Sequence, residues 1–280
     1  MSQPMYFPNA PFDLREALVC SRLVDTAYDM YRQWVAQGKP EQDDFQWQPK
    51  SQLDLTFGEP IWGNDPALWV LDRSEPFAFC AWSRNAAIWL VIRGTESAED
   101  WAADISTDLT DYKLAPNYGR AHAGFYKIYA SMSDAVRSAL GHAIRQVGNP
   151  EAIFLSAHSL GSALSTLAVP DILANTTADR DTMRIKHYNL ASPRVGDADF
   201  AAAYDANGVT TYRVVNTCDL VPEVPPAILG DELFEHVGVP VDFSAQYRSL
   251  AGNHSAVHSY GYALIHPQQP QGPMPASAAS

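Results

Sequence analysis

The sequence predicts an α/β protein in which helices cover both faces of a mostly parallel central sheet. Short apolar runs typical of strands alternate with long segments whose apolar residues recur at helical spacing. A chain of 280 residues with 46% hydrophobic content can also bury a sizeable core. Because no repeat and no Pro/Gly-rich linker divides it, we expect one domain over residues 1–265. A tail rich in Pro, Gln, Ser and Ala follows over residues 266–280, and we expect it to be disordered.

Three helices are predicted from apolar periodicity and from the residues that end it. The first covers residues 12–37 and closes at Gly38, and the second covers residues 125–147 and closes at Gly148. The third runs over residues 162–173 and is rich in small and apolar side chains. A last helical pattern covers residues 255–265.

Seven runs have the composition of strands, and one pair is close enough to form a hairpin. The runs are residues 67–72, 77–83, 86–93, 152–157, 185–190, 211–215 and 236–243. The second and third flank Arg84 and Asn85, which suit a tight turn. In sheets of this class, functional sites gather at the carboxyl ends of the strands.

Charge and cysteine content exclude several classes of partner. A net charge of −13 argues against nucleic acid binding, which needs clustered Lys and Arg, and it disfavours adsorption to anionic membranes. Binding to an uncharged oil surface is compatible with this charge. Cys20, Cys80 and Cys218 are widely spaced and predict neither a metal site nor a disulfide framework. No apolar run reaches transmembrane length and no signal peptide is visible, so we expect a cytoplasmic protein unless an export signal was removed.

The segment Ala157-His158-Ser159-Leu160-Gly161 carries the strongest chemical signal. It lies between an apolar strand and a helix, and its serine stands between small residues, as in a nucleophile elbow. Small residues are needed there because the strand and the helix approach closely. The alternative is an ordinary helix start, with Ser159 as its N-cap.

A serine nucleophile needs a base and a carboxylate that orients the base. Asp219 follows a strand, where such a carboxylate could reach an imidazole, although it could also cap its own turn. Four histidines follow it in the sequence: His236, His254, His258 and His266. We prefer His254, which we expect in a loop that begins at Gly252, and keep His258 as the alternate inside the last helical pattern.

Five separated segments resemble the class 3 lipases, the fungal triacylglycerol lipases and their bacterial relatives. They are VIRGT at 91–95, DWAAD at 100–104, HAGF at 122–125, AHSLG at 157–161 and the stretch from SPRVGD at 192 to the prolines at 222–226. Their order and spacing match over roughly residues 70–262. The resemblance implies an α/β-hydrolase fold and hydrolysis of carboxylic esters, with Ser159 as nucleophile and Asp219 as the acid member of the triad.

The same resemblance implies an oxyanion hole formed by the amides of Thr95 and Leu160, with the Thr95 hydroxyl assisting and Asp104 anchoring that hydroxyl. Elementary chemistry agrees, because Leu160 opens a helix, where amides lack partners and the dipole favours negative charge. Two positions depart from the family pattern, since Ala157 and Ser162 stand where glycine is usual. Members of the family place a tyrosine beyond the catalytic histidine, and Tyr260 and Tyr262 follow both His254 and His258, so they are compatible with either candidate base.

Residues 96–109 form a short amphipathic pattern with Trp101, Ile105 and Leu109 at four-residue spacing. The resemblance puts the family's lid here, so the segment is either a mobile cover over the site or a fixed surface helix.

The sequence therefore predicts a serine carboxylic ester hydrolase, foremost a lipase acting on acylglycerols, without metal or organic cofactor. Its partner would be a lipid or ester substrate, and an oil–water interface is compatible with its charge. A phospholipase A1 or a short-chain or feruloyl esterase is the alternative within this chemistry. A catalytically silent hydrolase-fold binding protein is the rival from another class.

Overall fold

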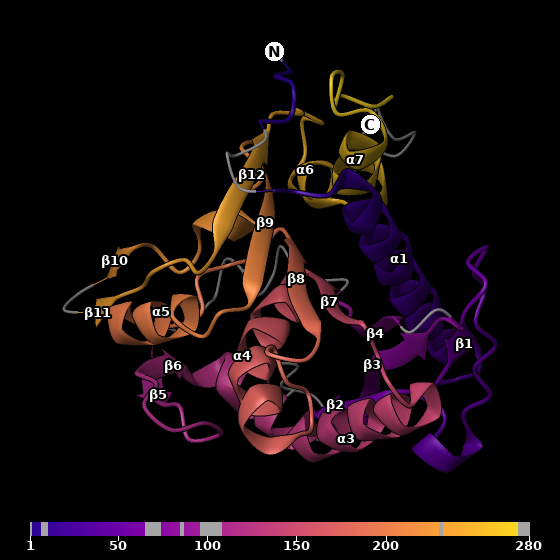
Figure 1. Ribbon diagram of the computed structural model, residues 1–280. Helices are drawn as coiled ribbons and strands as arrows, with labels where there is room; N and C mark the ends of the chain where they lie inside the picture. The colour runs from indigo at the N-terminus through magenta and orange to yellow at the C-terminus, as the bar shows by residue number, and fades with distance from the viewer. Residues whose placement is uncertain are drawn as a thin grey trace.

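The computed structural model describes residues 2–6, 11–64, 74–84, 87–95, 108–229 and 232–273. Within these residues the chain forms an eight-stranded mixed sheet in the order β1-β3-β4-β7-β8-β9-β12, with β2 paired to β3 (Figure 1). The neighbours from β4 to β12 run parallel, whereas β1, β2 and β4 run antiparallel to β3. The strands are β1 (Thr56–Phe57), β2 (Ile61–Asn64), β3 (Ser74–Trp82), β4 (Ala87–Ile92), β7 (Ala152–His158), β8 (Arg184–Leu190), β9 (Thr210–Asn216) and β12 (Val239–Phe243).

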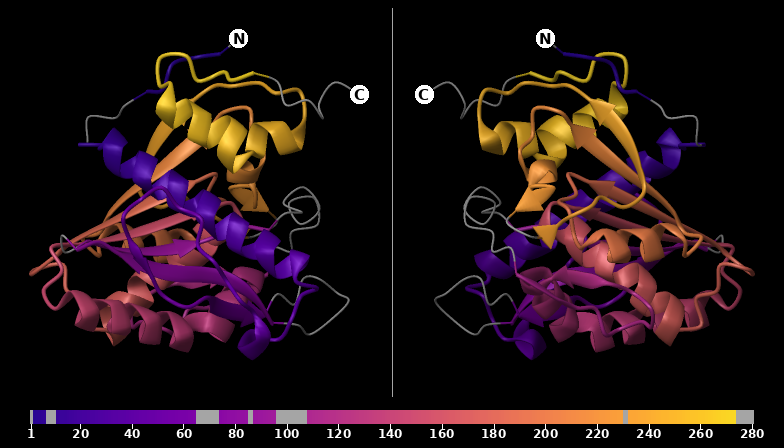
Figure 2. Two further views of the ribbon diagram at one scale, coloured as in Figure 1. Left: turned by 90° about the vertical axis from the view of Figure 1, so that its right-hand side faces the viewer. Right: turned by 90° about the vertical axis from the view of Figure 1, so that its left-hand side faces the viewer.

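Helices cover both faces of this sheet, as the sequence predicted (Figure 2). The α-helices are α1 (Leu14–Ala36), α3 (Ala123–Val147), α4 (Leu160–Asn175), α5 (Ala198–Asp205), α6 (Leu250–His254) and α7 (Tyr262–Ile265). The shorter turns are the 3₁₀ helices η1 (Gln42–Asp44) and η2 (Val221–Glu223) and the π-helix η3 (Ala256–Gly261). Two small sheets, β5 (Leu109–Asp111) with β6 (Arg120–His122) and β10 (Ile228–Leu229) with β11 (Glu232–Leu233), lie outside the main sheet.

The period-2 alternation of strand side chains builds a separate core on each face. Trp89 and Val91 of β4 pack on the face that carries α1, whereas Leu90 and Ile92 pack against α3 and α4 on the other. Both cores are mostly apolar along the central strands, which explains why these strands resemble continuous hydrophobic runs, although they also bury polar side chains such as Ser156 of β7 and His187 of β8.

The three predicted long helices form, with termini that follow from their end residues. The side chain of Asp13 caps α1 by accepting from the amides of Arg15 and Glu16, at 2.8 and 3.2 Å. Helix α3 ends at Gly148, whose φ of 81° is the left-handed conformation that glycine adopts without penalty. Helix α4 is buried from Leu160 to Ile172. Its apolar residues are not confined to one face, as is typical of a helix inside the core.

The predicted hairpin is confirmed by the antiparallel pairing of β3 with β4, in which Trp82 faces Ile88 and Ala78 faces Ile92. The strand expected over residues 67–72 lies outside the described residues. The strand expected over residues 236–243 begins only at Val239, because Gly238 turns the chain with a φ of 69°.

The expected lid falls almost entirely on residues 96–107, which lie outside the described residues. The last residue of that pattern, Leu109, differs from the expectation, because it begins strand β5 and faces His122 of β6.

Residues 266–273 differ from the predicted disordered tail, because they dock on the fold through backbone hydrogen bonds. The Met5 amide donates to the Pro267 carbonyl at 2.8 Å, and the Gly272 amide donates to the Tyr247 hydroxyl at 2.9 Å. Composition does not predict this docking, because the Pro267 carbonyl and the Gly272 amide are main-chain groups, which nearly every residue type carries. Residues 274–280 lie outside the described residues, and the single-domain boundary stays a prediction.

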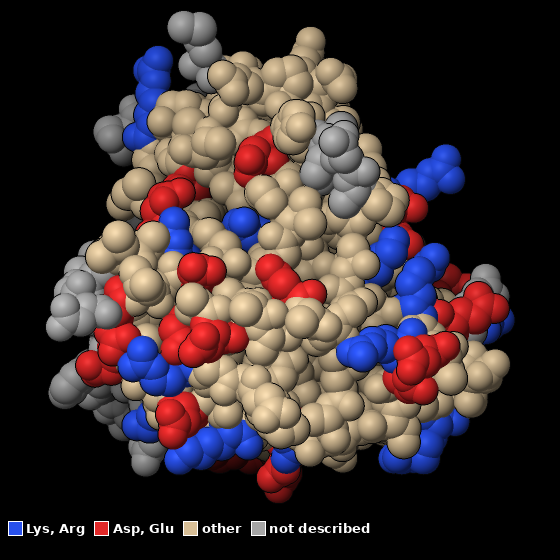
Figure 3. All heavy atoms as spheres, turned by 60° about the vertical axis from the view of Figure 1, so that its left-hand side comes forward, with Lys and Arg blue, Asp and Glu red and all other residues tan. Residues whose placement is uncertain are grey.

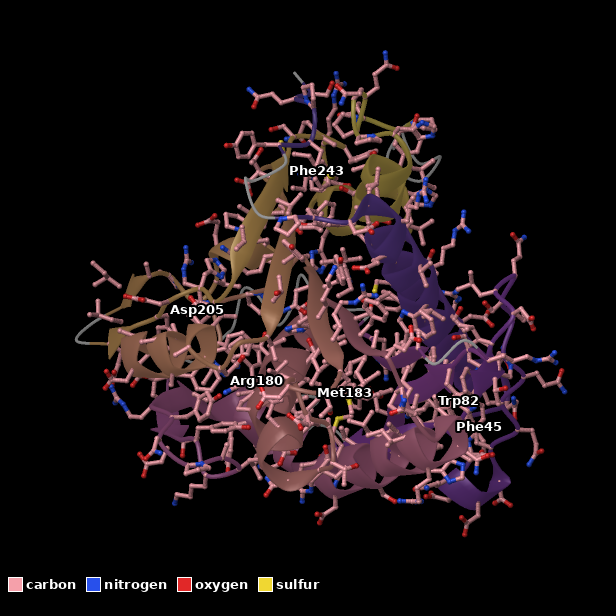
Figure 4. The ribbon with its side chains drawn as sticks, in the orientation of Figure 1. Phe45, Trp82, Arg180, Met183, Asp205 and Phe243 are labelled. Atoms are coloured by element: carbon pink, nitrogen blue, oxygen red, sulfur yellow. The ribbon has the colours of Figure 1, made fainter. Side chains whose placement is uncertain are left out.

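The sheet has a functional end, defined by the carboxyl ends of its parallel strands. Figure 4 labels Phe243, the last residue of β12, beside the C-terminal helices, and Asp205 at the opposite end. The Gly238 amide, which precedes β12, donates to Asp205 at 2.8 Å and fixes that opposite end. Helix α6 therefore lies where the parallel strands finish.

Acidic and basic side chains lie next to each other on the face drawn in Figure 3, and the upper part of that face is mostly uncharged. The ion pairs of the described residues include a cluster in which Arg120 lies 3.1 Å from Asp197 and 2.7 Å from Glu232. None of the described helices combines the length and the apolar character needed to cross a lipid bilayer.

Candidate active site

Ser159 lies at the tip of the turn between β7 and α4, in a backbone conformation that few residues adopt. Its φ and ψ are 59° and −131°, outside the regions that side chains with a Cβ normally occupy. The Ser159 amide donates to the Leu190 carbonyl of β8 at 2.9 Å, which holds the turn against the sheet. The sharp strand-to-helix turn predicted at Ser159 is therefore present, in a strained conformation.

Two glycines allow the strand end of β4 to touch this turn. A Cβ on Gly94 would lie 2.7 Å from the Ser159 Cβ and 2.8 Å from the His158 carbonyl oxygen. A Cβ on Gly161 would lie 2.5 Å from the carbonyl oxygens of both Ile92 and Arg93. Larger side chains at either glycine would therefore separate the elbow from β4.

The two departures from glycine in the elbow are accommodated. Ala157 is fully buried in the core. Ser162 is also fully buried, and its hydroxyl donates to the Leu190 carbonyl at 2.9 Å, the same carbonyl that accepts from Ser159. In this chain the serine thus adds a hydrogen bond between α4 and β8.

His254 and Asp219 form a buried pair. Nδ1 of His254 lies 2.7 Å from Oδ2 of Asp219, so this nitrogen donates and Nε2 faces away from the carboxylate. Their side chains are only 8% and 2% exposed, which leaves little room for water to compete. Sequence reasoning expected His254 in a loop. It is instead the last residue of helix α6, which is too short to show a periodic pattern.

The carboxylate of Asp219 receives two further donors. The Val221 amide donates to Oδ1 at 3.0 Å, and the Tyr260 hydroxyl donates to Oδ2 at 2.7 Å. Tyr260 also accepts from the Asn216 amide at 3.2 Å, so it ties the acid to the end of β9. Sequence reasoning noted Tyr260 without giving it a role.

His158 joins the elbow to the helix that carries His254. Its Nε2 lies 2.9 Å from the His254 carbonyl oxygen, and the centroids of the two rings lie 4.6 Å apart. Because a carbonyl only accepts, Nε2 carries the proton, and Nδ1 then accepts from the Tyr28 hydroxyl of α1 at 2.8 Å. Burial, followed by the positive charge that His254 can carry, holds the pKa of His158 well below its usual value.

These contacts bring Ser159 and His254 into one buried region with their reactive atoms unpaired. Among the described residues, Ser159 Oγ and His254 Nε2 are buried side-chain atoms that have no hydrogen-bond partner. Buried polar atoms are normally satisfied, so an unpaired hydroxyl and an unpaired imidazole nitrogen call for an explanation.

The other candidate histidines do not reach the acid. His258 lies in η3 and is exposed, with its amide bonded to the Ser255 hydroxyl. His236 bonds the Pro222 carbonyl through Nε2, and His266 packs on the ring of Tyr262. His254 is therefore the one of the four histidines following Asp219 that contacts it in the described structure.

The expected oxyanion residues lie beside the elbow in sequence or in space. Leu160 is the first residue of α4 and is buried, and Thr95 directly follows Gly94, whose backbone touches Ser159. Asp104 lies outside the described residues. The roles of Thr95, Leu160 and Asp104 stay predictions.

Comparison with known proteins assigns the family. Residues 89–229, half of the chain, match the family model described as "Lipase (class 3)". The chain belongs to the class 3 lipase family. The matched residues contain β4 from Trp89 onward, the turn at Ser159 and Asp219.

Curated relatives are similar over part of their length. Phospholipase A1-II 3 of rice is 34% identical over 183 residues, which cover 57% of this chain and 44% of the relative. A lipase of Rhizopus niveus is 29% identical over 194 residues, covering 69% of this chain and 45% of the relative. The chain thus spans less than half the length of these relatives.

Solved structures confirm the α/β-hydrolase fold. The triacylglyceride lipase of Rhizomucor miehei superposes with a TM-score of 0.64 at 23% identity and covers 83% of this chain and 81% of its own. The lipase of Rhizopus microsporus var. chinensis gives 0.63 at 23% identity, covering 86% of this chain and 82% of its own. A third solved structure, of a triacylglycerol lipase, is similar to this chain with a TM-score of 0.64 at 22% identity, covering 85% of this chain and 82% of its own. Its catalytic centre is described as a serine protease triad.

Proposed function

We propose that this class 3 lipase hydrolyses the carboxylic esters of acylglycerols with Ser159 as nucleophile, His254 as general base and Asp219 as the orienting carboxylate. The supporting observation is the pairing of His254 Nδ1 with Asp219 at 2.7 Å, while His254 Nε2 and Ser159 Oγ are buried without partners among the described residues. An unpaired base nitrogen and an unpaired hydroxyl at a strained elbow are what nucleophilic catalysis requires.

Acylation begins when Ser159 Oγ attacks the ester carbonyl carbon and passes its proton to His254 Nε2. The Asp219 carboxylate, bonded to Nδ1, stabilises the imidazolium that forms. The amides of Thr95 and Leu160 donate to the oxyanion of the tetrahedral intermediate. Loss of one such donor typically slows a reaction by a factor of about 10² to 10³.

Collapse of the intermediate transfers the Nε2 proton of His254 to the leaving alcohol and leaves an acyl ester on Ser159. Water then attacks this ester, with His254 again as base, and releases the fatty acid. His158 assists by staying neutral beside His254. Its lowered pKa avoids a second positive charge next to the imidazolium.

The substrate is proposed to meet the enzyme at an oil–water interface. Three apolar side chains within four residues of Asp219 or His254 in the sequence are about half exposed: Leu220 (55%), Leu250 (46%) and Val257 (50%). A neighbouring fungal lipase was solved as an inhibitor complex that served as a model for interfacial activation (TM-score 0.60, 21% identity). Exposed apolar groups around the site favour contact with an uncharged lipid surface.

A phospholipase A1 activity is the second candidate, supported by the 34% identity to the rice phospholipase. Triacylglycerol emulsions, phosphatidylcholine vesicles and p-nitrophenyl esters of graded chain length separate the candidates. Dominant release of fatty acid from the vesicles would favour the phospholipase, and activity confined to soluble short esters would favour an esterase.

The triad is tested by substitution of two neighbouring histidines and the serine. We expect Ser159→Ala and His254→Ala each to lower kcat by about 10⁴-fold or more, because members of a triad act as a unit. His258→Ala is the matched control and should retain wild-type activity, because that residue is exposed. Activity on p-nitrophenyl butyrate is the measurement.

A fluorophosphonate probe provides the independent readout. It should modify the wild type at Ser159 and leave Ser159→Ala unmodified. A wild type that is folded but does not react would support a silent hydrolase-fold binding protein, and equal losses in His254→Ala and His258→Ala would contradict the assigned base.

A further inference from the structure

Arg93 is a fully buried arginine directly after β4, and all three of its guanidinium nitrogens donate hydrogen bonds. Nε donates to the Pro76 carbonyl at 2.8 Å, and Nη2 donates to Glu75 at 2.6 Å. Nη1 donates to the carbonyl of Gly94, its own neighbour, at 2.8 Å. The side chain is 1% exposed, so no solvent competes for these bonds.

Aromatic rings hold the guanidinium in place. Its central carbon lies 3.9 Å from the ring centroid of Tyr31 on α1 and 4.6 Å from that of Phe77 on β3. Together with the three hydrogen bonds, these contacts allow the planar group one orientation. A buried ion pair adds little net stability, since desolvation offsets its attraction. We therefore look for the role of Arg93 in its hydrogen bond to the Gly94 carbonyl rather than in its ion pair with Glu75.

That bond fixes the direction of the Thr95 amide. The Gly94 carbonyl and the Thr95 N–H belong to one peptide unit, which is planar and trans. In a trans peptide the C=O and N–H bonds point in opposite directions, so a donor that fixes the oxygen also fixes the N–H. A charged donor forms a short, strong bond and polarises the amide that accepts it.

The peptide between Gly94 and Thr95 lies so close to Ser159 that a small rotation would change the direction of the Thr95 N–H relative to the elbow. A Cβ on Gly94 would come within 2.7 Å of the Ser159 Cβ, so the backbone of Gly94 touches the elbow. On the other side of the same strand end, the carbonyl of Arg93 packs on Gly161 of α4. The direction of the Thr95 N–H relative to Ser159 is thus set within a few ångströms of the reacting atoms.

We propose that Arg93 is a positioning residue of the oxyanion hole, which aims the Thr95 amide at the developing oxyanion of the ester carbonyl. The inference rests on the proposed function, in which that amide is one of the two donors. Arg93 itself does not contact the substrate. Glu75, Tyr31 and Phe77 act indirectly, because they hold the Arg93 guanidinium in place.

The test compares Arg93→Met and Arg93→Lys with the wild type on an ester and on the matching thionoester, whose C=S replaces the C=O. We expect Arg93→Met to lower kcat on the ester about 10- to 100-fold, with KM within about twofold, since the missing bond acts in the transition state. The ester-to-thionoester ratio of kcat/KM should fall at least about fivefold, because an oxyanion hole favours oxygen. Arg93→Lys should recover part of both quantities, since its ammonium can replace only some of the bonds.

The ratio separates positioning from stability, because it does not depend on how much enzyme is folded. Arg137→Met is the matched control. It removes an arginine from the buried Asp171 carboxylate, 2.7 Å away, without contacting β4 or the elbow. We expect Arg137→Met to lower Tm and to keep the wild-type ratio.

A wild-type ratio in Arg93→Met, with or without loss of activity, would overturn the inference. If Arg93→Met does not fold, the ratio in Arg93→Lys decides in the same way. A wild type that neither reacts with a fluorophosphonate nor cleaves esters would contradict the proposed function and the inference together. A reactive wild type with an unchanged variant ratio would contradict the inference alone.

Discussion

At the residue scale, the candidate site is organised around one carboxylate. Asp219 accepts from the His254 imidazole, the Tyr260 hydroxyl and the Val221 amide, and its side chain is 2% exposed. Three donors in a water-poor environment hold the carboxyl group in a single orientation. The orientation of His254 therefore depends on Asp219, which lies in the loop after β9, and on residues of η2 and η3.

Substitution of Tyr260 tests this dependence. Tyr260→Phe removes one donor to the carboxylate, and we expect kcat to fall about 10-fold, because hydrogen bonds to charged groups are worth about 1.5–3 kcal/mol. Tyr262→Phe is the matched control, since its ring packs on His266, and we expect near wild-type activity. Steady-state kinetics on p-nitrophenyl butyrate is the measurement, and equal losses in both variants would contradict the role of Tyr260.

At the element scale, the site exists because the end of β4 packs against the start of α4. The contact requires Gly161, above which the carbonyls of Ile92 and Arg93 leave no space for a Cβ. Helix α6 carries His254, the proposed base, and is held by Asn253, whose side-chain amide donates to the Cys218 carbonyl at 2.7 Å. A five-residue helix thus keeps His254 next to Asp219 through a side-chain contact.

Alanine substitution of two glycines tests the close packing of β4 and α4. We expect Gly161→Ala to lower the free energy of unfolding by at least about 1–3 kcal/mol and to reduce kcat, because the strand end must move away from the elbow. Gly141→Ala in α3 is the control. It meets only the flexible end of Arg145 at 3.4 Å and should stabilise the helix by about 0.5–1 kcal/mol.

Urea unfolding and kinetics on both variants measure these effects. A Gly161→Ala enzyme with wild-type stability and activity would show that the strand end and the helix can separate without cost.

At the scale of the whole molecule, buried neutral histidines couple stability to pH. Burial lowers the pKa of His187 to about 3, and burial together with the charges of Arg213 and Arg194 lowers that of His236 to about 3. His158 is shifted in the same direction. Below about pH 6.5 these histidines bind protons in the unfolded chain but stay neutral in the folded chain. The free energy of unfolding therefore decreases as pH falls.

Two partly buried carboxyls act with the opposite sign. Burial raises the pKa of Asp25 to about 6, so the folded chain binds this proton more tightly than the unfolded chain does. Between about pH 6 and pH 4 the fold therefore gains stability from Asp25 as pH falls. Burial raises the pKa of Asp242 as well, so two carboxyls oppose the three histidines, and the larger shifts of the histidines leave a net loss of stability in acid.

The contribution of one histidine can be isolated with His187→Gln. Glutamine can replace the bonds that His187 makes to Ser165 and Tyr204, at 2.8 and 2.7 Å, but it does not titrate. Between pH 7 and pH 5 we expect this variant to lose about 2 kcal/mol less than the wild type does.

Urea unfolding at the two pH values provides the comparison. Exposed His258→Gln serves as the control and should follow the wild type. An identical pH dependence in His187→Gln and the wild type would contradict the assignment of His187 as a neutral buried group.

The sequence by itself determined the α/β class, the long helices, the β3–β4 hairpin and the position of Ser159 at an elbow. These features depend on local periodicity and on the small residues near one turn, which a chain displays in order. It also ranked His254 above His258, although it expected a loop where the structure has a short helix.

Only the tertiary structure decided which distant groups meet. The pairing of His254 with Asp219 joins residues 35 positions apart, and the hydrogen bond of His158 to Tyr28 joins residues 130 positions apart. The bonds that Arg93 donates to Pro76 and Glu75 join residues 17 and 18 positions apart. The docking of residues 266–273 belongs here too. Such contacts are set by how strands order in the sheet and how helices pack on it, and hydrogen-bonding groups leave no periodic trace of their partners in the sequence.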